Sequence, residues 1–350
     1  MEIKDLIIDE SYSIRNAIKK LDITAKKVLL ICEENRLKAV VTDGDIRRWI
    51  LRNGDLSDSI REIANYSPIY IIENEKNKAK ETMKKFSISC LPVVGIKGEL
   101  KSIVFWDDLE IYDSDNKARL NIPVVIMAGG LGTRLYPYTK ILPKPLIPIG
   151  DTPIVERIID KFYKYGCSEF HLTINYKKAM IKSYFNELEV DYTINYVEED
   201  KPLGTGGSLY LVKDKIKSAF FVSNCDILID ADYSQIYESH KKQGNKITIV
   251  CAVKNLTIPY GVIKLEENGS IANMVEKPEF SFLTNTGVYI IEPEVLDVIE
   301  DDKFIHLPDI AQKCMDIGMK VGVYPITERA WMDMGEIDQM QEMMERLGVK

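Results

Sequence analysis

The sequence lacks the features that mark several large classes of protein. No apolar run approaches the roughly 20 residues that a membrane-spanning helix requires, so we expect no membrane partner. The 46 lysine and arginine residues are outnumbered by 54 acidic residues, and the net charge of -8 disfavours nucleic acid as a partner. The charged N-terminus has no apolar segment behind it, which indicates a cytoplasmic protein without a secretion signal.

Cysteine and histidine are also sparse. The 6 cysteines form no C-x-x-C pair, and only 3 histidines accompany them, which argues against a zinc finger or a redox motif. We therefore expect reduced cysteines that pack as small apolar side chains.

The N-terminal third contains a degenerate internal repeat. Residues 28–31 match 91–94, and residues 39–46 match 102–109. A helical stretch precedes these pieces in each copy, 17–21 in the first and 82–86 in the second. Each copy should fold as helix, strand, turn, strand, helix. Neither copy can bury much core alone, so we expect the two to pack against each other.

The pattern changes after a polar stretch at 110–121 that lacks apolar periodicity and indicates a linker. From residue 122 onward, predicted strands and helices alternate, which favours an α/β sheet. The expected strands are 122–127, 170–174, 192–197, 219–223 and 247–253, followed by a hairpin of 260–265 with 271–275. The predicted division is a first repeat at 1–57, a second at 58–115, a linker at 116–121 and an α/β domain at 122–350.

Two helices are predicted from their ends and their apolar faces. Asp151 should cap a helix with Pro153 in its first turn, and its apolar side chains through Tyr163 share one face. A C-terminal helix should begin after Gly335, with its methionines packed in the core.

A glycine-rich segment at 128–146 carries the strongest chemical signal. Its glycines follow a predicted strand, so backbone N–H groups can approach an anion without a Cβ in the way. Arg134 and Lys144 add two cations, and three prolines stiffen the path between them. The segment therefore suits a polyphosphate whose charge must be neutralised while a P–O bond breaks. It is neither a Walker A loop nor a dinucleotide fingerprint.

This segment resembles the signature of the sugar nucleotidyltransferases, G-G-x-G-T-R-L-x-P-x-T-x-x-x-P-K-P, and the resemblance extends from about residue 122 to the C-terminus. It implies a Rossmann-like mixed sheet, Mg²⁺ as cofactor, and transfer of a nucleoside monophosphate to a sugar 1-phosphate. Arg134 would hold the triphosphate and Lys144 would steady phosphate in the transition state. The nucleotide would also contact Ala128, Gly129, Gly130, Gly132 and Thr133.

Two aspartates are the predicted metal ligands. Asp226 ends a strand, where an α/β sheet faces its ligand crevice, and Asp333 lies in a Trp-Met-Asp-Met-Gly segment. The resemblance places matching carboxylates on one Mg²⁺ between the α-phosphate and the sugar phosphate. Two carboxylates suffice, because Mg²⁺ prefers few of them together with phosphates and water.

A second glycine cluster resembles the loop that faces the nucleotide base in this family, and its predicted contacts are Gly204, Thr205 and Gly207. The acidic segment before it begins at Glu198, and carboxylates can accept hydrogen bonds from the N1–H and amino group of guanine. The segment looks like the guanylyl branch, which predicts GTP, with CTP and UTP as alternatives.

The predicted acceptor site comes from three short matches to the same family. Gly261 corresponds to a glycine beside the sugar, Glu276 to a ligand of sugar hydroxyls, and Lys277 to a ligand of the sugar phosphate. Asn285 falls in a segment that lines the sugar pocket.

The N-terminal repeat resembles a pair of CBS domains (a Bateman module), which often bind adenine nucleotides. Thr42 and Asp45 fit the T-x-x-D motif for phosphate and ribose. The second copy has Phe105 in place of the threonine and keeps an aspartate, Asp108. We therefore expect one adenine-nucleotide site per chain, built on Thr42 and Asp45, with a ligand-free dimerisation module as the alternative.

The combination of both regions resembles the glucosamine-1-phosphate guanylyltransferases of the legionaminic acid pathway of bacterial glycans. A mannose-1-phosphate or heptose-1-phosphate guanylyltransferase is the enzymatic alternative. A silent nucleotide sensor with an enzyme-like domain is the alternative from another class, and the intact set of catalytic residues speaks against it. We expect a homo-oligomer.

Overall fold

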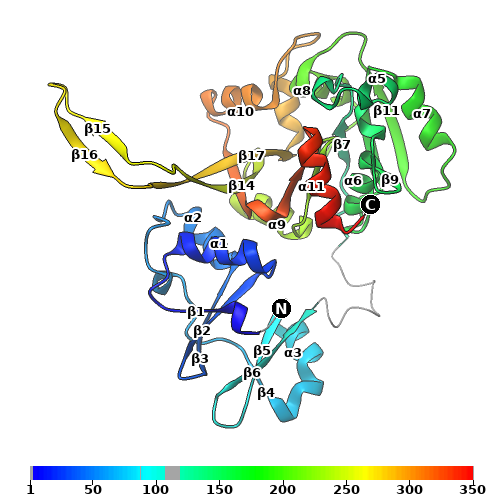
Figure 1. The fold of residues 1–350 in the computed structure, drawn as a ribbon. Coiled ribbons are helices and arrows are strands. Elements are labelled where there is room, and N and C mark those ends of the chain that lie inside the picture. The colour runs from blue at the N-terminus through cyan, green and yellow to red at the C-terminus, as the bar shows by residue number, and fades with distance from the viewer. Residues whose placement is uncertain (1–2, 87, 107–118, 350) are drawn as a thin grey trace. The chain divides into compact units, whose positions relative to one another are not determined.

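The computed structural model describes residues 3–86, 88–106 and 119–349 (Figure 1). The chain forms two compact units. The first contains residues 1–116, 253–283 and 325–329, and the second contains 117–252, 284–324 and 330–350. The first unit therefore includes two segments from the predicted α/β domain as well as the N-terminal repeats.

The first repeat is a three-stranded sheet flanked by helices. Its elements are η1 (Ile3–Leu6), β1 (Ile7–Ile8), α1 (Ile14–Thr24), β2 (Val28–Glu33), β3 (Arg36–Thr42), α2 (Asp43–Ile50) and η2 (Ile60–Glu62). Strand β2 pairs in parallel with β1 and antiparallel with β3. Ser13 caps α1 by accepting a hydrogen bond from the N–H of Asn16, and the apolar face of the helix is buried from Ile14 to Leu21.

The second repeat has the same topology in its described part. It consists of β4 (Ile71–Ile72), η3 (Glu73–Lys78), α3 (Ala79–Phe86), β5 (Cys90–Val94) and β6 (Leu100–Phe105). Strand β5 again pairs in parallel with the strand before the helix and antiparallel with the next one. The two copies share an apolar cluster around Val28, Leu30 and Leu100, so the predicted packing of one copy on the other is confirmed. Asp108 lies outside the described residues.

A seven-stranded mixed sheet forms the centre of the second unit, in the order β11-β10-β7-β12-β17-β14-β18. Its strands are β7 (Val124–Met127), β10 (Glu169–Ile174), β11 (Thr193–Glu198), β12 (Phe220–Asn224), β14 (Ile247–Thr257), β17 (Glu279–Ile291) and β18 (Val321–Thr327). Neighbours from β11 to β12 are parallel, whereas β12 and β17 are antiparallel. The predicted α/β class and mixed sheet are confirmed.

The second unit also contains helices α5 (Tyr138–Ile141), α6 (Ile154–Tyr163), α7 (Lys178–Asn186), α8 (Gly204–Gly207), α9 (Tyr233–Gln243), α10 (Leu307–Asp316) and α11 (Ile337–Leu347). The prediction that Asp151 caps α6 is wrong. Pro153 stands at the N-cap without a side-chain hydrogen bond, and Asp151 instead pairs with Arg157 at 3.2 Å. Tyr163, predicted on the buried face, is 39% exposed because it lies at the last turn.

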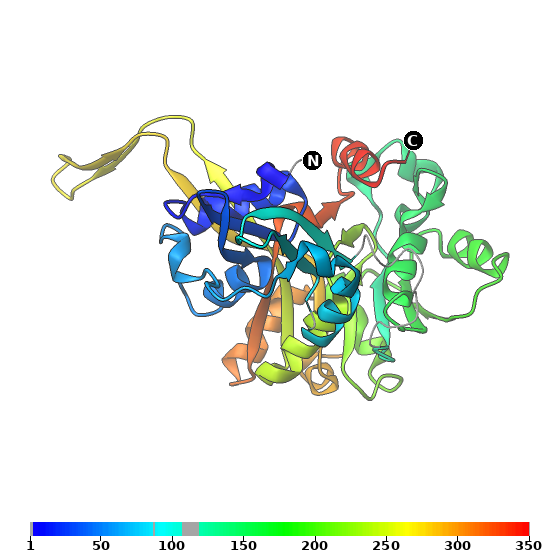
Figure 2. The ribbon, with the colours of Figure 1, turned by 90° about the horizontal axis from the view of Figure 1, so that it is seen from below.

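The predicted hairpin is confirmed as β15 (Val262–Leu265) with β16 (Ile271–Val275), an antiparallel pair. It belongs to the first unit, and no third strand joins it in either view (Figures 1 and 2). All five residues of β16 are exposed. Across the described ranges, no helix has the length and apolarity to cross a bilayer.

The sheet topology brings two predicted segments together. Strands β7 and β12 are parallel neighbours, so the loops that follow them leave the same edge of the sheet. The glycine-rich loop at 128–132 follows β7, and Asp226 is the second residue after β12, which ends at Asn224. Ligand crevices of α/β sheets lie at this edge.

Candidate active site

In the glycine-rich loop, Gly132 occupies a position where glycine is required. Gly132 has φ +64°, and a Cβ there would stand 2.8 Å from Thr139 Cγ2 and 3.1 Å from Lys144 Cβ. The hydroxyl of Thr139 donates to the carbonyl of Gly132 at 3.0 Å, which closes the turn. Gly130, in contrast, has no atom within 4 Å of its ideal Cβ position. The loop is thus packed on one side and open on the other, as a loop that approaches an anion must be.

Arg134 is presented by η4 (Thr133–Leu135), which Leu135 anchors by complete burial. The side chain of Arg134 is 65% exposed, and its nearest acidic partner, Glu336 Oε1, is 3.9 Å away. A guanidinium held at this distance keeps most of its donors available for a phosphate.

Lys144 and Asp226 form a buried ion pair. Lys144 lies in η5 (Lys144–Leu146), and its Nζ donates to Asp226 Oδ2. Their side chains are only 11% and 12% exposed. Removing one partner from such a pair leaves an uncompensated buried charge, which lowers the free energy of unfolding. Each of the two residues therefore offsets the cost of burying the other.

A short strand pair places the two predicted metal ligands side by side. Strand β13 (Ile227–Ile229) pairs antiparallel with β19 (Trp331–Asp333), and Ile227 is opposite Asp333. The N–H of Met334 donates to the carbonyl of Asp226 at 2.9 Å, which extends the pairing by one residue. Two carboxylates that are 107 positions apart in sequence numbering, 226 and 333, are thereby fixed on neighbouring strands.

Asp333 has the properties that are expected of a metal ligand. Among the described residues, no hydrogen-bond donor reaches its buried Oδ1. Burial raises the pKa of the Asp333 carboxyl, and the negative charge of Asp226 raises it further, while Lys144 opposes both effects. A buried carboxylate oxygen without a partner costs free energy that a cation would recover. The two aspartates therefore fit a divalent ion such as Mg²⁺ that takes its remaining ligands from phosphates and water.

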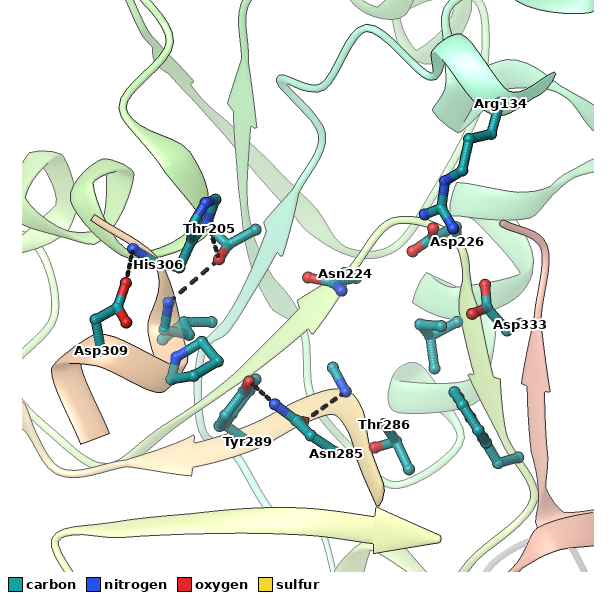
Figure 3. A pocket seen from close by; sticks show the side chains of 15 residues that line it. Arg134, Thr205, Asn224, Asp226, Asn285, Thr286, Tyr289, His306, Asp309 and Asp333 are labelled. Atoms are coloured by element: carbon teal, nitrogen blue, oxygen red, sulfur yellow. Dashed lines mark hydrogen bonds between the residues drawn. The ribbon is translucent and has the colours of Figure 1, made fainter. Parts of the chain in front are cut away.

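These residues line a cavity of about 430 Å³. Figure 3 shows Arg134, Asp226 and Asp333 at one end and Thr205, His306 and Asp309 at the other. The full lining is Arg134, Thr205, Asn224, Asp226, Ile227, Asn285, Thr286, Gly287, Tyr289, His306, Leu307, Pro308, Asp309, Trp331 and Asp333. The volume is in the range of small-molecule sites, and the cation Arg134 and the two predicted metal ligands lie at the same end.

The second glycine cluster differs from its predicted role in one respect. A Cβ on Gly204 would stand 2.6 Å from the carbonyl oxygen of Ile305, and one on Gly207 would stand 2.4 Å from that of Lys303. The glycines are therefore needed for close packing of α8 against the chain before α10. Within this cluster, Thr205 is the residue that lines the cavity.

The acidic segment places two neighbouring carboxylates differently. Glu198 forms ion pairs with Lys178 and Lys182, whose hydrogen bonds lower the pKa of the Glu198 carboxyl to about 2. Glu199 is 6% exposed, accepts a hydrogen bond from the N–H of Leu203, and stands 2.7 Å from the ideal Cβ position of Gly129. Glu199 thus joins the two glycine loops. The alternation of buried Val197 and exposed Glu198 at the end of β11, continued by one residue, is the signal that could have identified Glu199.

The predicted acceptor residues fall in two places. In the first unit, Gly261 lies next to Glu276, with 3.0 Å between its ideal Cβ position and Glu276 Oε2, and the N–H of Lys277 donates to the carbonyl of Tyr260 at 3.2 Å. In the second unit, Asn285 lines the cavity, and its Oδ1 accepts from the N–H of Gly287 at 2.9 Å.

Several cavity residues carried no signal in the sequence. Asn224 ends β12, Tyr289 lies within β17, and His306 with Asp309 forms the capping box of α10. The sequence His-Leu-Pro-Asp is a recognisable start of a helix, so it predicts where α10 begins. It does not predict that α10 contacts the cavity.

Thr42 and Asp45 form the capping box of α2 in the first repeat. Asp45 Oδ2 accepts from the N–H of Thr42 at 2.8 Å and from its hydroxyl at 2.6 Å, while Oδ1 pairs with Arg48. In the second repeat, the ring of Phe105 lies under the ammonium of Lys26, 4.1 Å from its centroid. The motif that predicts a nucleotide site is thus also a complete helix cap.

Comparisons with known proteins match the part of the chain that contains the cavity. The family profile described as Nucleotidyl transferase matches residues 123–348. The mannose-1-phosphate guanyltransferase of Debaryomyces hansenii is 37% identical over 185 residues, which cover 50% of this chain and 51% of that protein. The chain spans about half the length of the curated relatives it matches.

A solved structure shares the fold as well. HddC from Yersinia pseudotuberculosis superposes with a TM-score of 0.51 at 25% identity, covering 65% of this chain and 99% of that chain. A second structure of HddC, with a TM-score of 0.50, is a complex with GMP-PN.

Proposed function

Because the chain belongs to the nucleotidyl transferase family, we propose that it transfers a nucleoside monophosphate from a nucleoside triphosphate to a sugar 1-phosphate and releases pyrophosphate. The observation that carries this proposal is the convergence of Arg134, Asp226 and Asp333 at one end of the cavity, with Lys144 paired to Asp226. Such an arrangement neutralises phosphate charge, which is the main task in phosphoryl chemistry.

In the proposed reaction, an oxygen of the sugar phosphate attacks the α-phosphorus and forms a new P–O bond. The bond from the α-phosphorus to the bridging oxygen breaks, and its electron pair leaves with pyrophosphate. Arg134, exposed beside the glycine-rich loop, binds the triphosphate, and Lys144 donates hydrogen bonds to the phosphate at the reacting centre. Asp226 and Asp333 would hold Mg²⁺, which would supply positive charge to the reacting phosphates.

For the nucleotide, we propose GTP. The relatives named as mannose-1-phosphate guanylyltransferases and the HddC complex with GMP-PN support a guanine nucleotide. Within the acidic segment, Glu199 is the better placed carboxylate, since Glu198 is held by two lysines.

A matched pair of variants tests the base assignment. Glu199→Gln should lower kcat/KM for GTP more than for UTP, while Glu198→Gln should leave the preference unchanged. Discrimination that depends on buried hydrogen bonds can reach roughly 10⁴-fold. Loss of the GTP preference in Glu198→Gln alone would assign base recognition to Glu198. An equal loss of kcat/KM for GTP and UTP in each variant would show that neither acid recognises the base.

For the acceptor, we propose a hexose 1-phosphate, with glucosamine 1-phosphate as the substrate. This choice rests on the combination of the N-terminal repeats with a guanylyl-type segment. The names of the relatives favour mannose 1-phosphate as the second candidate. The predicted acceptor residues Gly261, Glu276, Lys277 and Asn285 belong to this proposal.

The N-terminal repeats, proposed as a CBS pair, would bind one adenine nucleotide at Thr42 and Asp45. Their sheet topology repeats exactly once in the described residues, β1-β2-β3 and then β4-β5-β6, which supports two related modules. Phe105 replaces the threonine in the second copy, so a second site is not proposed.

The decisive experiment measures pyrophosphate release with four nucleoside triphosphates against glucosamine, mannose and heptose 1-phosphates in the presence of Mg²⁺. We expect the highest kcat/KM with GTP and glucosamine 1-phosphate. Highest activity with mannose 1-phosphate would select the second candidate. No release with any pair, together with nucleotide binding by the N-terminal repeats, would instead identify a silent sensor.

A further inference from the structure

One face of α1 in the first repeat makes polar contacts with β17, the strand that leads out of the hairpin. Arg15 and Lys19 are one helical turn apart and share that face. Arg15 Nε donates to Ser281 Oγ at 2.9 Å, and Lys19 Nζ pairs with Glu279 Oε1 at 2.6 Å. All four residues belong to the first unit.

The same helix face continues to a second segment of the first unit. Asp22, seven residues after Arg15, accepts at Oδ1 from the N–H of Arg329 at 3.2 Å. The carbonyl of Asp22 accepts from Arg329 Nη1 at 3.2 Å. Helix α2 adds a parallel contact, because Arg47 Nε donates to the carbonyl of Pro325 at 3.1 Å.

An apolar contact accompanies these polar ones. Val253, 4% exposed, is part of the core of the first repeat together with the buried residues of α1. Ser281 also donates to Asn255 Oδ1 at 2.7 Å, which ties the outgoing strand to the incoming one beside this core. The base of the hairpin is therefore packed as well as hydrogen-bonded.

The two contacted segments stand next to site residues in the sequence. Glu279 follows Lys277, the predicted ligand of the sugar phosphate, by two residues, and Arg329 precedes Asp333, a predicted metal ligand, by four. We propose that α1 of the first repeat is a positioning element for the predicted acceptor residues Glu276 and Lys277 of the same unit, acting through Lys19 on Glu279, while Asp22 holds the same helix to Arg329. This inference rests on the proposed function.

The physical reason lies in the hairpin itself. A two-stranded ribbon is marginally stable alone, and β15 with β16 has no third strand in the described structure. The placement of Glu276 and Lys277 therefore depends on what holds the base of the ribbon. A displacement of about 1 Å in a positioning group can lower a rate by roughly 10²-fold. The contacts of α1 can therefore affect the reaction rate strongly even though each contributes little to the free energy of folding.

The test is a charge-swap cycle at Lys19 and Glu279. Both side chains are about one-third exposed, 33% and 35%, so simple removal would have a small effect, whereas Lys19→Glu replaces attraction by repulsion. We expect Lys19→Glu to raise KM for the sugar 1-phosphate on the order of tenfold, with KM for GTP unchanged. Adding Glu279→Lys should restore KM, because the pair is re-formed in reverse.

Lys20→Glu is the matched control. It makes the same charge change on the same helix, one residue from Lys19, and the described part of the chain gives Lys20 no ion pair. We expect it to leave both KM values at the wild-type level. A general loss of folding would lower the melting temperature and the apparent kcat, without raising KM for the sugar 1-phosphate alone.

A second readout separates this inference from the proposed function. Amide hydrogen exchange in 271–281 should be faster in Lys19→Glu than in the wild type and the control, and should slow again in the double variant. This measurement requires no turnover. Wild-type protein without transferase activity would overturn the proposed function, while unchanged exchange in Lys19→Glu, or no rescue of KM by Glu279→Lys, would overturn the positioning role.

Discussion

Two acidic sites in this chain are built in opposite ways. At the end of the cavity, Asp226 and Asp333 are brought together by β13 and β19, and Asp333 Oδ1 is buried without a donor among the described residues. In the first repeat, both oxygens of Asp45 have partners within six residues of chain, at Thr42 and Arg48. The first arrangement costs stability and leaves capacity for a cation, whereas the second stabilises a helix. The difference separates a site built for function from a motif that folding alone explains.

The largest effect should come from removing an acid at the cavity. Asp226→Ala should lower kcat by on the order of 10²-fold or more, because it removes a contact made to charge in the transition state. It also strands Lys144 as a buried cation, which adds a loss of stability of about 3–5 kcal/mol. Steady-state pyrophosphate release and thermal unfolding measure the two effects.

Lys144→Met with Asp226→Asn serves as the control for stranded charge. The double change removes both buried charges, so it should regain stability without regaining activity. Near-wild-type turnover of Asp226→Ala in saturating Mg²⁺ would contradict the metal assignment.

The sequence predicts the parts of this site that depend on local pattern. Gly132 needs a left-handed backbone and closes a turn between a strand and a short helix, and such turns are visible as glycine after an apolar run. Asp226 is the second residue after β12, so the strand prediction also located the carboxylate. The parallel sheet then fixes both loops at one edge.

The features of the site that depend on tertiary packing could not be predicted from the sequence. Gly204 and Gly207 look like a loop open to a ligand, yet the carbonyls of Ile305 and Lys303 occupy the space beside them. The contact of Lys19 with Glu279 joins residues separated by 260 positions, and no periodicity encodes such a pair. The polar side chain at 279 is indistinguishable from a solvated one until its partner is known.

A smaller effect is expected for Asp333, where substitution should change the pH dependence of stability rather than the rate alone. Burial, with the charge of Asp226, raises the pKa of the Asp333 carboxyl above its unfolded value. The folded protein then binds a proton that the unfolded chain has released, so stability without metal should fall as pH rises from the unfolded pKa through the folded pKa. Asp333→Asn should flatten this dependence and unfold at a higher temperature than the wild type at neutral pH, without Mg²⁺.

Mg²⁺ should reverse that order, because it binds the folded wild type and not the variant. Thermal unfolding at several pH values, with Mg²⁺ and with chelator, measures both effects. A variant less stable than the wild type at neutral pH in chelator would show that the charged Asp333 carboxylate stabilises the folded protein, and would contradict the prediction.

The smallest effect should come from Asp45, and it decides whether the helix cap is also a ligand site. Asp45→Ala removes the capping box of α2 and should cost about 1 kcal/mol of stability, with or without a ligand. Asp45→Asn keeps an acceptor oxygen for Thr42 and should cost less, while it removes the charge. If an adenine nucleotide binds here, its ribose hydroxyls must displace Arg48 from Asp45, so binding should weaken in both variants despite their different stabilities.

Calorimetry of the full chain with AMP, ADP and ATP measures this binding. Unchanged affinity in both variants would place the nucleotide elsewhere, and no binding at millimolar concentration would leave Thr42 and Asp45 as a cap alone, with dimerisation as the function of the repeats.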